Sequence, residues 1–173
     1  QRHDILRSVY QEEGDVLQVI LDDFDFTLTQ HDLTHLPETE REAAMTALVD
    51  ADISKSFDLA QDLMLRAAFI KLSQGATADE MEGVLLLNIH HIAVDGWSMD
   101  VLMQEFVTLY QQIVETGQGS LPAQPLRYAD YALWQREWLD EETLDQQVSY
   151  WREQIEDAPL IHEIQLDFPR PKT

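Results

Sequence analysis

The chain has 173 residues, enough for about one domain with a sizeable hydrophobic core. Its 11 Lys and Arg residues face 33 Asp and Glu residues, and the net charge of −22 argues against binding nucleic acid or an anionic membrane. No window is apolar enough for a membrane span, and the lack of cysteine excludes disulfides and thiolate nucleophiles and favours a reducing, cytoplasmic setting.

The first half of the chain predicts two strands separated by a helix. The run Val16–Leu21 is rich in β-branched residues and lies between turn-forming residues, which is typical of a strand. Pro37, followed by Glu38 and Glu40, indicates a helix start, since proline and acidic residues suit the first helical turn. The apolar run Leu63–Leu72 predicts a second strand.

The second half predicts a central strand followed by helices. The run Val84–His91 is nearly all apolar, as expected for a strand covered on both faces. Ser98 is a good N-cap for a helix that we expect to begin at about Met99 and to end at Gly117. Further helices are expected at about Tyr128–Leu139 and Glu141–Glu156, and a last strand at Ile161–Phe168. The fold class is therefore α/β.

The end of the central strand is the candidate functional site. His90 and His91 follow the apolar run directly, and Asp95 and Gly96 come next, before Trp97 and Ser98. Buried strands seldom end in adjacent imidazoles and a carboxylate, because each polar group needs a partner once water is excluded.

Two other interpretations of the histidine pair are possible. A metal site is disfavoured, and we expect none: side chains alternate along a strand, so His90 and His91 would face opposite sides, and no cysteine is available as a ligand. Alternatively, both rings could be hydrogen-bonded core histidines that precede a turn at Asp95-Gly96.

The pattern His-His-x-x-x-Asp-Gly resembles the active-site signature of the condensation domains of nonribosomal peptide synthetases, whose superfamily includes chloramphenicol acetyltransferase. Residues 2–10, Arg-His-Asp-Ile-Leu-Arg-Ser-Val-Tyr, are similar to a second family motif, from which Asp4, Ser8 and Tyr10 depart conservatively. Residues 128–134 match the Tyr-x-Asp-Tyr-Ala-x-Trp motif in full, and residues 150–171 are similar to the end of the family's first lobe.

The resemblance implies a chloramphenicol acetyltransferase-like lobe, with a mixed, mostly antiparallel sheet flanked by helices, as one half of a two-lobed pseudo-dimer. We expect residues 1–168 to form the N-terminal lobe with a truncated start, and residues 169–173 to begin the crossover to an absent C-terminal lobe.

The resemblance also implies the reaction and its residues. The amine of an acceptor aminoacyl thioester attacks a donor acyl or peptidyl thioester, both carried on phosphopantetheine arms; no cofactor binds the domain directly. His91 is the expected catalytic histidine with His90 beside it. Asp95 is expected to be structural and paired with Arg2, while Gly96 allows close backbone approach. Trp97, Ser98 and Arg7 are secondary candidates for the tunnel wall.

Expected partners are donor and acceptor carrier protein domains, an adjacent adenylation domain and the missing lobe. By the same resemblance, heterocyclisation domains carry Asp at the position of His90, so that activity is not expected. Epimerisation domains typically have Ser-Trp where this chain has Trp97-Ser98, so the order of these two residues favours condensation. Two alternatives remain: a stand-alone CoA-dependent acyltransferase, or an incompetent lobe that serves as a docking unit. We expect this polypeptide by itself to be inactive.

Overall fold

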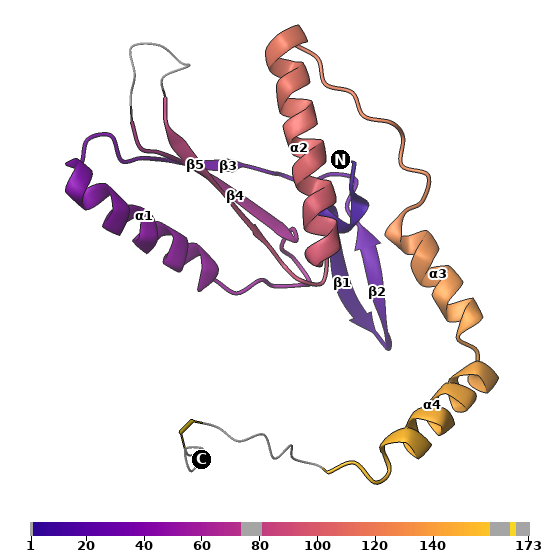
Figure 1. The fold of residues 1–173 in the computed structure, drawn as a ribbon. Helices are drawn as coiled ribbons and strands as arrows, with labels where there is room; N and C mark the ends of the chain where they lie inside the picture. The colour runs from indigo at the N-terminus through magenta and orange to yellow at the C-terminus, as the bar shows by residue number, and fades with distance from the viewer. Residues whose placement is uncertain (1, 74–80, 160–166, 169–173) are drawn as a thin grey trace. The chain divides into compact units, whose positions relative to one another are not determined.

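The computed structural model describes residues 2–73, 81–159 and 167–168 (Figure 1). The chain divides into two compact units, residues 1–128 and 129–173. No helix within these described ranges is long and apolar enough to cross a membrane. In chain order the elements are η1 (Asp4–Arg7), β1 (Ser8–Glu13), β2 (Asp15–Ile20), β3 (Leu28–Asp32), α1 (Glu38–Ile53), β4 (Leu65–Lys71), β5 (Gly83–Ile89), α2 (Gly96–Thr116), α3 (Tyr128–Trp138) and α4 (Glu141–Ile155).

Strands β1 and β2 form an antiparallel hairpin that begins immediately after η1. Gly14 alone connects them, with a φ of 91° that other residues rarely adopt. The hairpin is joined to η1 by side chains: the buried Ser8 donates its hydroxyl to the Asp4 carbonyl at 2.8 Å and accepts from Gln18 at 2.8 Å.

Strands β3, β4 and β5 form a second sheet in which β4 is central. β3 runs parallel to β4 and β5 runs antiparallel to it, so the sheet is mixed. Parallel neighbours need a crossover connection, and α1 lies within the connection between β3 and β4. The amide of Asn88 on β5 binds Asp52 at the end of α1, with 2.8 Å to the carboxylate oxygen.

The buried core of the first unit lies around β4. Met64 and Ile70 are fully buried, and Ala67 and Ala68 nearly so. Residues of β4 and β5 with odd numbers line a cavity shared with α2, whereas Ala68, Ile70 and Leu86 line one shared with the end of α1. The two helices therefore lie on opposite faces of this sheet, as Figure 1 also shows.

Most of the predicted elements are present. The predicted strands at 16–21, 63–72 and 84–91 correspond to β2, β4 and β5, and the predicted helices correspond to α1 to α4. Two strands, β1 and β3, were not predicted, and the expected strand at 161–168 lies almost entirely outside the described residues.

The start of α2 differs from the prediction. The helix begins at Gly96 rather than Met99, and its N-cap is Asp95 rather than Ser98. Its end is as predicted: Gly117 has a φ of 75° and its N–H donates to the Ile113 carbonyl at 2.9 Å.

The second unit contains α4 and all but the first residue of α3. Asp140 is the N-cap of α4, and its carboxylate accepts from the Thr143 N–H at 2.8 Å. Along α3, the rings of Trp134 and Trp138 stack with centroids 5.9 Å apart.

Candidate active site

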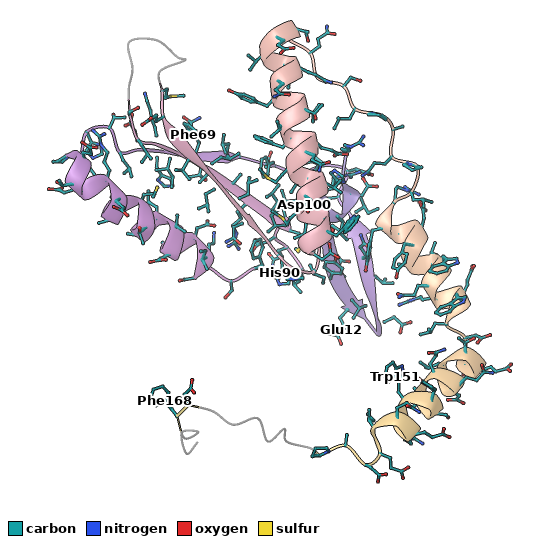
Figure 2. The ribbon with its side chains drawn as sticks, in the orientation of Figure 1. Glu12, Phe69, His90, Asp100, Trp151 and Phe168 are labelled. Carbon is teal, nitrogen blue, oxygen red and sulfur yellow. The ribbon has the colours of Figure 1, made fainter. Side chains whose placement is uncertain are left out.

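The two histidines lie at the end of β5, where the strand gives way to a turn. The His90 N–H donates to the Met64 carbonyl at 3.0 Å, one residue beyond the Leu65–Ile89 pair of β4 and β5. The Ala93 N–H then donates to the His90 carbonyl at 3.0 Å and closes a four-residue turn. Figure 2 shows His90 at the foot of the sheet, beside the first turns of α2 where Asp100 lies.

His90 is held by the protein. Its Nδ1 accepts a hydrogen bond from the Ile92 N–H at 3.1 Å, so a neutral ring carries its proton on Nε2. The Phe57 ring packs edge-on against it with centroids 5.6 Å apart. The guanidinium carbon of Arg66 lies over the Phe57 ring, 3.8 Å from the ring centroid. Phe57 therefore contacts both His90, edge to face, and Arg66.

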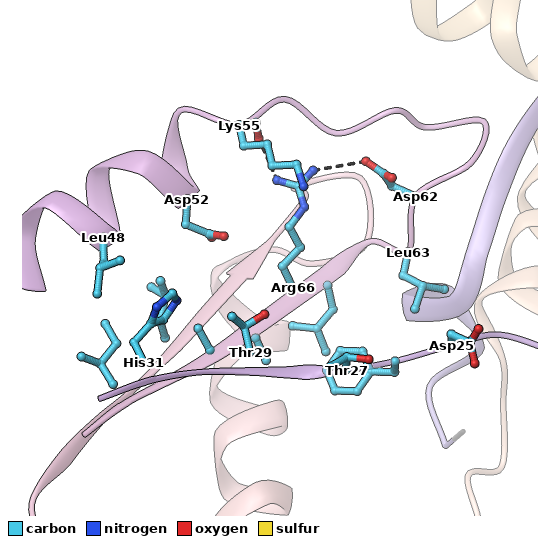
Figure 3. Close-up of a pocket in the computed structure, with 16 residues that line it drawn as sticks. Asp25, Thr27, Thr29, His31, Leu48, Asp52, Lys55, Asp62, Leu63 and Arg66 are labelled. Atoms are coloured by element: carbon cyan, nitrogen blue, oxygen red, sulfur yellow. Dashed lines mark hydrogen bonds and ion pairs between the residues drawn. The ribbon is translucent and has the colours of Figure 1, made fainter. Parts of the chain in front are cut away.

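Arg66 is itself fixed on the α1 side of the sheet, at the wall of a cavity of about 330 Å³ (Figure 3). It donates to the Lys55 carbonyl at 2.8 Å and to the Asp62 carboxylate at 3.2 Å. His90 is therefore connected, through Phe57 and Arg66, to the loop that follows α1.

His91 differs from its neighbour because it is exposed and lies in the turn. Strand alternation ends at Ile89, so the assumption that both rings continue the strand pattern does not hold for His91. Imidazole is the side chain best suited to accept and release a proton near neutral pH. An exposed imidazole held on a turn can do so toward an external molecule.

Asp95 caps α2. Its Oδ1 accepts from the Ser98 N–H at 2.8 Å and from the Ser98 hydroxyl at 2.5 Å. These bonds, the hydroxyl first, lower the pKa of Asp95, and attraction to His91 adds to the effect. The carboxylate therefore stays ionised and locks the start of the helix.

The expected pair between Arg2 and Asp95 is wrong. Arg2 instead donates from Nε and Nη2 to Glu105 on α2, at 2.9–3.0 Å, and from Nη1 to the Pro122 carbonyl at 2.5 Å. Asp95 already accepts hydrogen bonds from Ser98. The Glu105 side chain is only 19% exposed, so its negative charge would be poorly solvated without a nearby cation.

His3 joins this cluster around Glu105. Its Nε2 lies 2.7 Å from the Glu105 carboxylate, and its Nδ1 lies 2.9 Å from the Gln124 amide nitrogen. A neutral ring satisfies both bonds when Nε2 donates and Nδ1 accepts. The Arg2 and His3 contacts lower the pKa of Glu105, with Arg2 as the largest cause.

Glu105 was missed by sequence reasoning, although a signal existed. It lies between Leu102 and Phe106 on the otherwise apolar face of α2. A carboxylate at such a position predicts a charged partner from another segment.

The remaining candidates lie in different places. Trp97 is 83% exposed, and it lines the same cavity as Ser98. Arg7 does not join them: it binds the Leu21 carbonyl and Asp4 and lines a separate cavity with Arg2. A Cβ placed on Gly96 would meet no atom within 4 Å, so nothing in this part of the chain requires glycine there. Among the described residues, no three His, Asp or Glu side chains converge on a possible metal position.

A family model described as "Condensation domain" matches residues 1–172. The chain is 40% identical over 172 residues to one of the linear gramicidin synthase proteins of Brevibacillus parabrevis, covering 99% of this chain and 2% of that protein. It is 37% identical to the phosphinothricin tripeptide synthetase PhsC of Streptomyces viridochromogenes, covering 99% of this chain and 15% of that protein. The chain thus spans only a small part of these relatives.

Solved structures show the same fold. The X-domain from teicoplanin biosynthesis matches with a TM-score of 0.74 and 29% identity, covering 99% of this chain and 36% of that chain. The epimerization domain from the third module of tyrocidine synthetase B matches with a TM-score of 0.74 and 27% identity, covering 97% and 36%. These likenesses confirm the predicted partial lobe with mixed sheets flanked by helices.

Proposed function

Since the chain belongs to the condensation-domain family, we propose that it forms the amide bond of nonribosomal peptide synthesis as part of a larger enzyme. The substrates are two thioesters: a donor acyl or peptidyl group and an acceptor amino acid. Both are carried on the phosphopantetheine arms of carrier proteins, and an adenylation domain supplies the activated amino acid.

The exposure of His91 is the observation that carries this proposal. The signature His-His-x-x-x-Asp-Gly spans the junction of β5 and α2, and its members have different surroundings. His90 is packed against Phe57 and Asp95 is bound to Ser98, whereas His91 is exposed in the turn between them. The motif thus presents one exposed imidazole between two side chains that are bound within the protein.

The reaction follows from this arrangement. The acceptor nitrogen attacks the donor carbonyl carbon, the new C–N bond forms, the C–S bond breaks and the carrier thiol leaves. The attacking amine must lose a proton, and the leaving sulfur must gain one. We assign His91 to accept that proton at an imidazole nitrogen, or to orient the amine by a hydrogen bond.

Typical magnitudes indicate how much of the rate depends on His91 and how much on positioning by the carrier arms. Holding two reactants in an aligned geometry can lower a barrier by about 7–11 kcal/mol, whereas a general base adds on the order of 10²–10⁴-fold in rate. If positioning by the carrier arms supplies most of the acceleration, loss of His91 leaves a measurable residual rate.

The test uses the synthetase polypeptide that contains this chain, with donor and acceptor carrier proteins loaded with their amino acids. His91→Ala is expected to reduce amide formation, followed by mass spectrometry, by about 10²–10⁴-fold. His35→Ala replaces another exposed histidine and serves as the matched control. Full product formation by folded His91→Ala would overturn the assignment.

Two alternatives are decided by the same assay. A CoA-dependent acyltransferase would use acyl-CoA in place of the loaded donor carrier. Residues 1–173 alone are expected to give no product. They correspond to only 36% of the length of a solved relative. In addition, the apolar α2 side chains Phe106 and Val107 are over 40% exposed, as expected of a surface that a further part of the enzyme covers. Product from this polypeptide alone would show that it is a complete catalyst.

A further inference from the structure

A cavity of about 260 Å³ adjoins the turn that carries His91. Ala93 and Val94, the second and third residues after His91, form part of its wall. Successive Cα atoms lie about 3.8 Å apart, so the Cα atoms of His91 and Ala93 are within about 8 Å of each other. His91 itself does not line the cavity, but this short separation is comparable to the length of an amino-acid side chain.

The wall of the cavity is mainly apolar. Residues from η1, the turn and α2 contribute aliphatic side chains: Ile5, Leu6, Ala93, Val94, Val101 and Leu102. Trp97 and Tyr128 add aromatic rings. Such a surface favours an apolar ligand group, because burying it removes apolar area from water on both sides.

The polar residues of the wall are already engaged. Ser98 binds Asp95 through both its N–H and its hydroxyl. His3 bridges Glu105 and Gln124, at 2.7 and 2.9 Å. None of the residues that line the cavity carries a carboxylate, ammonium or guanidinium group, so a charged ligand group would have no ion-pair partner in this wall.

From these observations we propose that this cavity is a subsite for the apolar side chain of a thioester-bound amino acid. The inference rests on the proposed function and adds a substrate class to it. Sites for whole small molecules usually measure about 300–1,000 Å³, so this smaller volume suits one side chain rather than a complete pantetheine-bound acyl group. The side chain can come from the donor or from the acceptor.

Val101 offers the sharpest test because it lines the cavity and yet is 41% exposed, so substitutions disturb folding little. Val101→Phe reduces the volume and Val101→Ala enlarges it. Val114→Phe places the same ring on the same helix at a residue outside the cavity wall, 67% exposed, and is the matched control. The synthetase polypeptide that contains this chain is used throughout.

Rates are measured with carrier proteins loaded with Ala, Leu or Phe, first varying the donor and then the acceptor. Val101→Phe is expected to lower kcat/KM for Leu and Phe about 10- to 200-fold relative to Ala in one of the two arms, which identifies the source. Val101→Ala is expected to shift the preference in that same arm toward Phe. Equal effects on all three amino acids, or equal effects of Val114→Phe, would overturn the subsite.

A binding measurement separates this inference from the proposed function. Titration calorimetry with leucyl- and alanyl-pantetheine is expected to show tighter binding of the leucyl compound, and loss of that difference in Val101→Phe. This result supports the subsite even if no amide forms. No difference between the compounds in the unaltered protein overturns it, whatever the catalytic result.

Discussion

The guanidinium of Arg2 donates to both carboxylate oxygens of Glu105, a residue 103 positions away along the chain. Both side chains are mostly shielded, with 28% and 19% exposed. The pair fastens the segment before η1 to the middle of α2. The turn with His91 lies just before α2 in the chain. A contact that holds α2 in place therefore also helps to hold this turn.

Removing one partner of this pair is expected to destabilise the fold. Glu105→Ala leaves Arg2 and His3 without their shared acceptor, which costs about 1–3 kcal/mol for a shielded polar group. Urea unfolding measures the change. Glu115→Ala, an exposed acid on the same helix, is the control and is expected to be nearly neutral. Equal stability of the two variants would show that the Arg2–Glu105 pair does not stabilise the fold.

Asp95→Ala is expected to lower Tm by a few degrees and to lower activity, because α2 loses its N-cap and the turn loses its support. Asp95→Asn still accepts the Ser98 bonds and is expected to keep most of the stability. Asp140→Ala removes the equivalent cap of α4 and serves as the comparison. If Asp95→Asn keeps Tm but loses activity, the carboxylate takes part in the chemistry and the structural role is wrong.

Acid is expected to destabilise the protein through the helix caps. Hydrogen bonds from Ser98 and Thr143 lower the pKa values of Asp95 and Asp140 below the ordinary value of 3.8. Because these pKa values are lower in the folded state, the unfolded chain binds protons first as the pH falls. The stabilisation is full well above pH 3.8 and is lost as the pH drops through the lower folded values.

Urea midpoints at pH 7, 5, 4 and 3 test this dependence. The unaltered protein is compared with the double variant Asp95→Asn, Asp140→Asn at each pH. The difference between their urea midpoints reports on the two carboxylates and not on the general change in net charge. That difference is expected to shrink below about pH 4. A difference that stays constant to pH 3 would show that neither cap depends on ionisation.

His90 and His91 are expected to differ in stability experiments. His90→Ala removes the contact with Phe57 and the acceptor for the Ile92 N–H, and should cost about 1–3 kcal/mol. His91→Ala removes an exposed ring and should change stability by less than about 0.5 kcal/mol. Thermal unfolding of the two variants, measured side by side, decides whether the structural and chemical roles are divided in this way.

Gly96 and Gly117 allow a similar contrast. Gly117→Ala forces a side chain into a left-handed conformation and is expected to cost about 1 kcal/mol. Gly96→Ala meets no neighbouring atom and is expected to leave stability unchanged or slightly improved. If a substrate approaches the Gly96 backbone, as the family resemblance implies, Gly96→Ala lowers kcat/KM in the amide-forming assay while Tm stays constant.

Local patterns predicted much of the fold because they depend on neighbouring residues. Pro37 with Glu38 marked the start of α1, and Gly117 marked the end of α2. The start of α2 was harder, since Asp95 and Ser98 are both good N-caps. The strands β1 and β3 were missed because their polar side chains give no apolar run, and they depend on pairing with β2 and β4.

The sequence by itself determined the family and the candidate histidines, because the motif His-His-x-x-x-Asp-Gly and its companion segments are read from residue order alone. Tertiary structure decided which charges meet. The sequence motif suggested Asp95 as the partner of Arg2, and only the folded chain shows that Asp95 binds Ser98 while Glu105 binds the arginine. Arg2 and Glu105 are 103 residues apart in the sequence, and they pair because the folded backbone brings their side chains together. The order of residues alone does not show which distant side chains become neighbours.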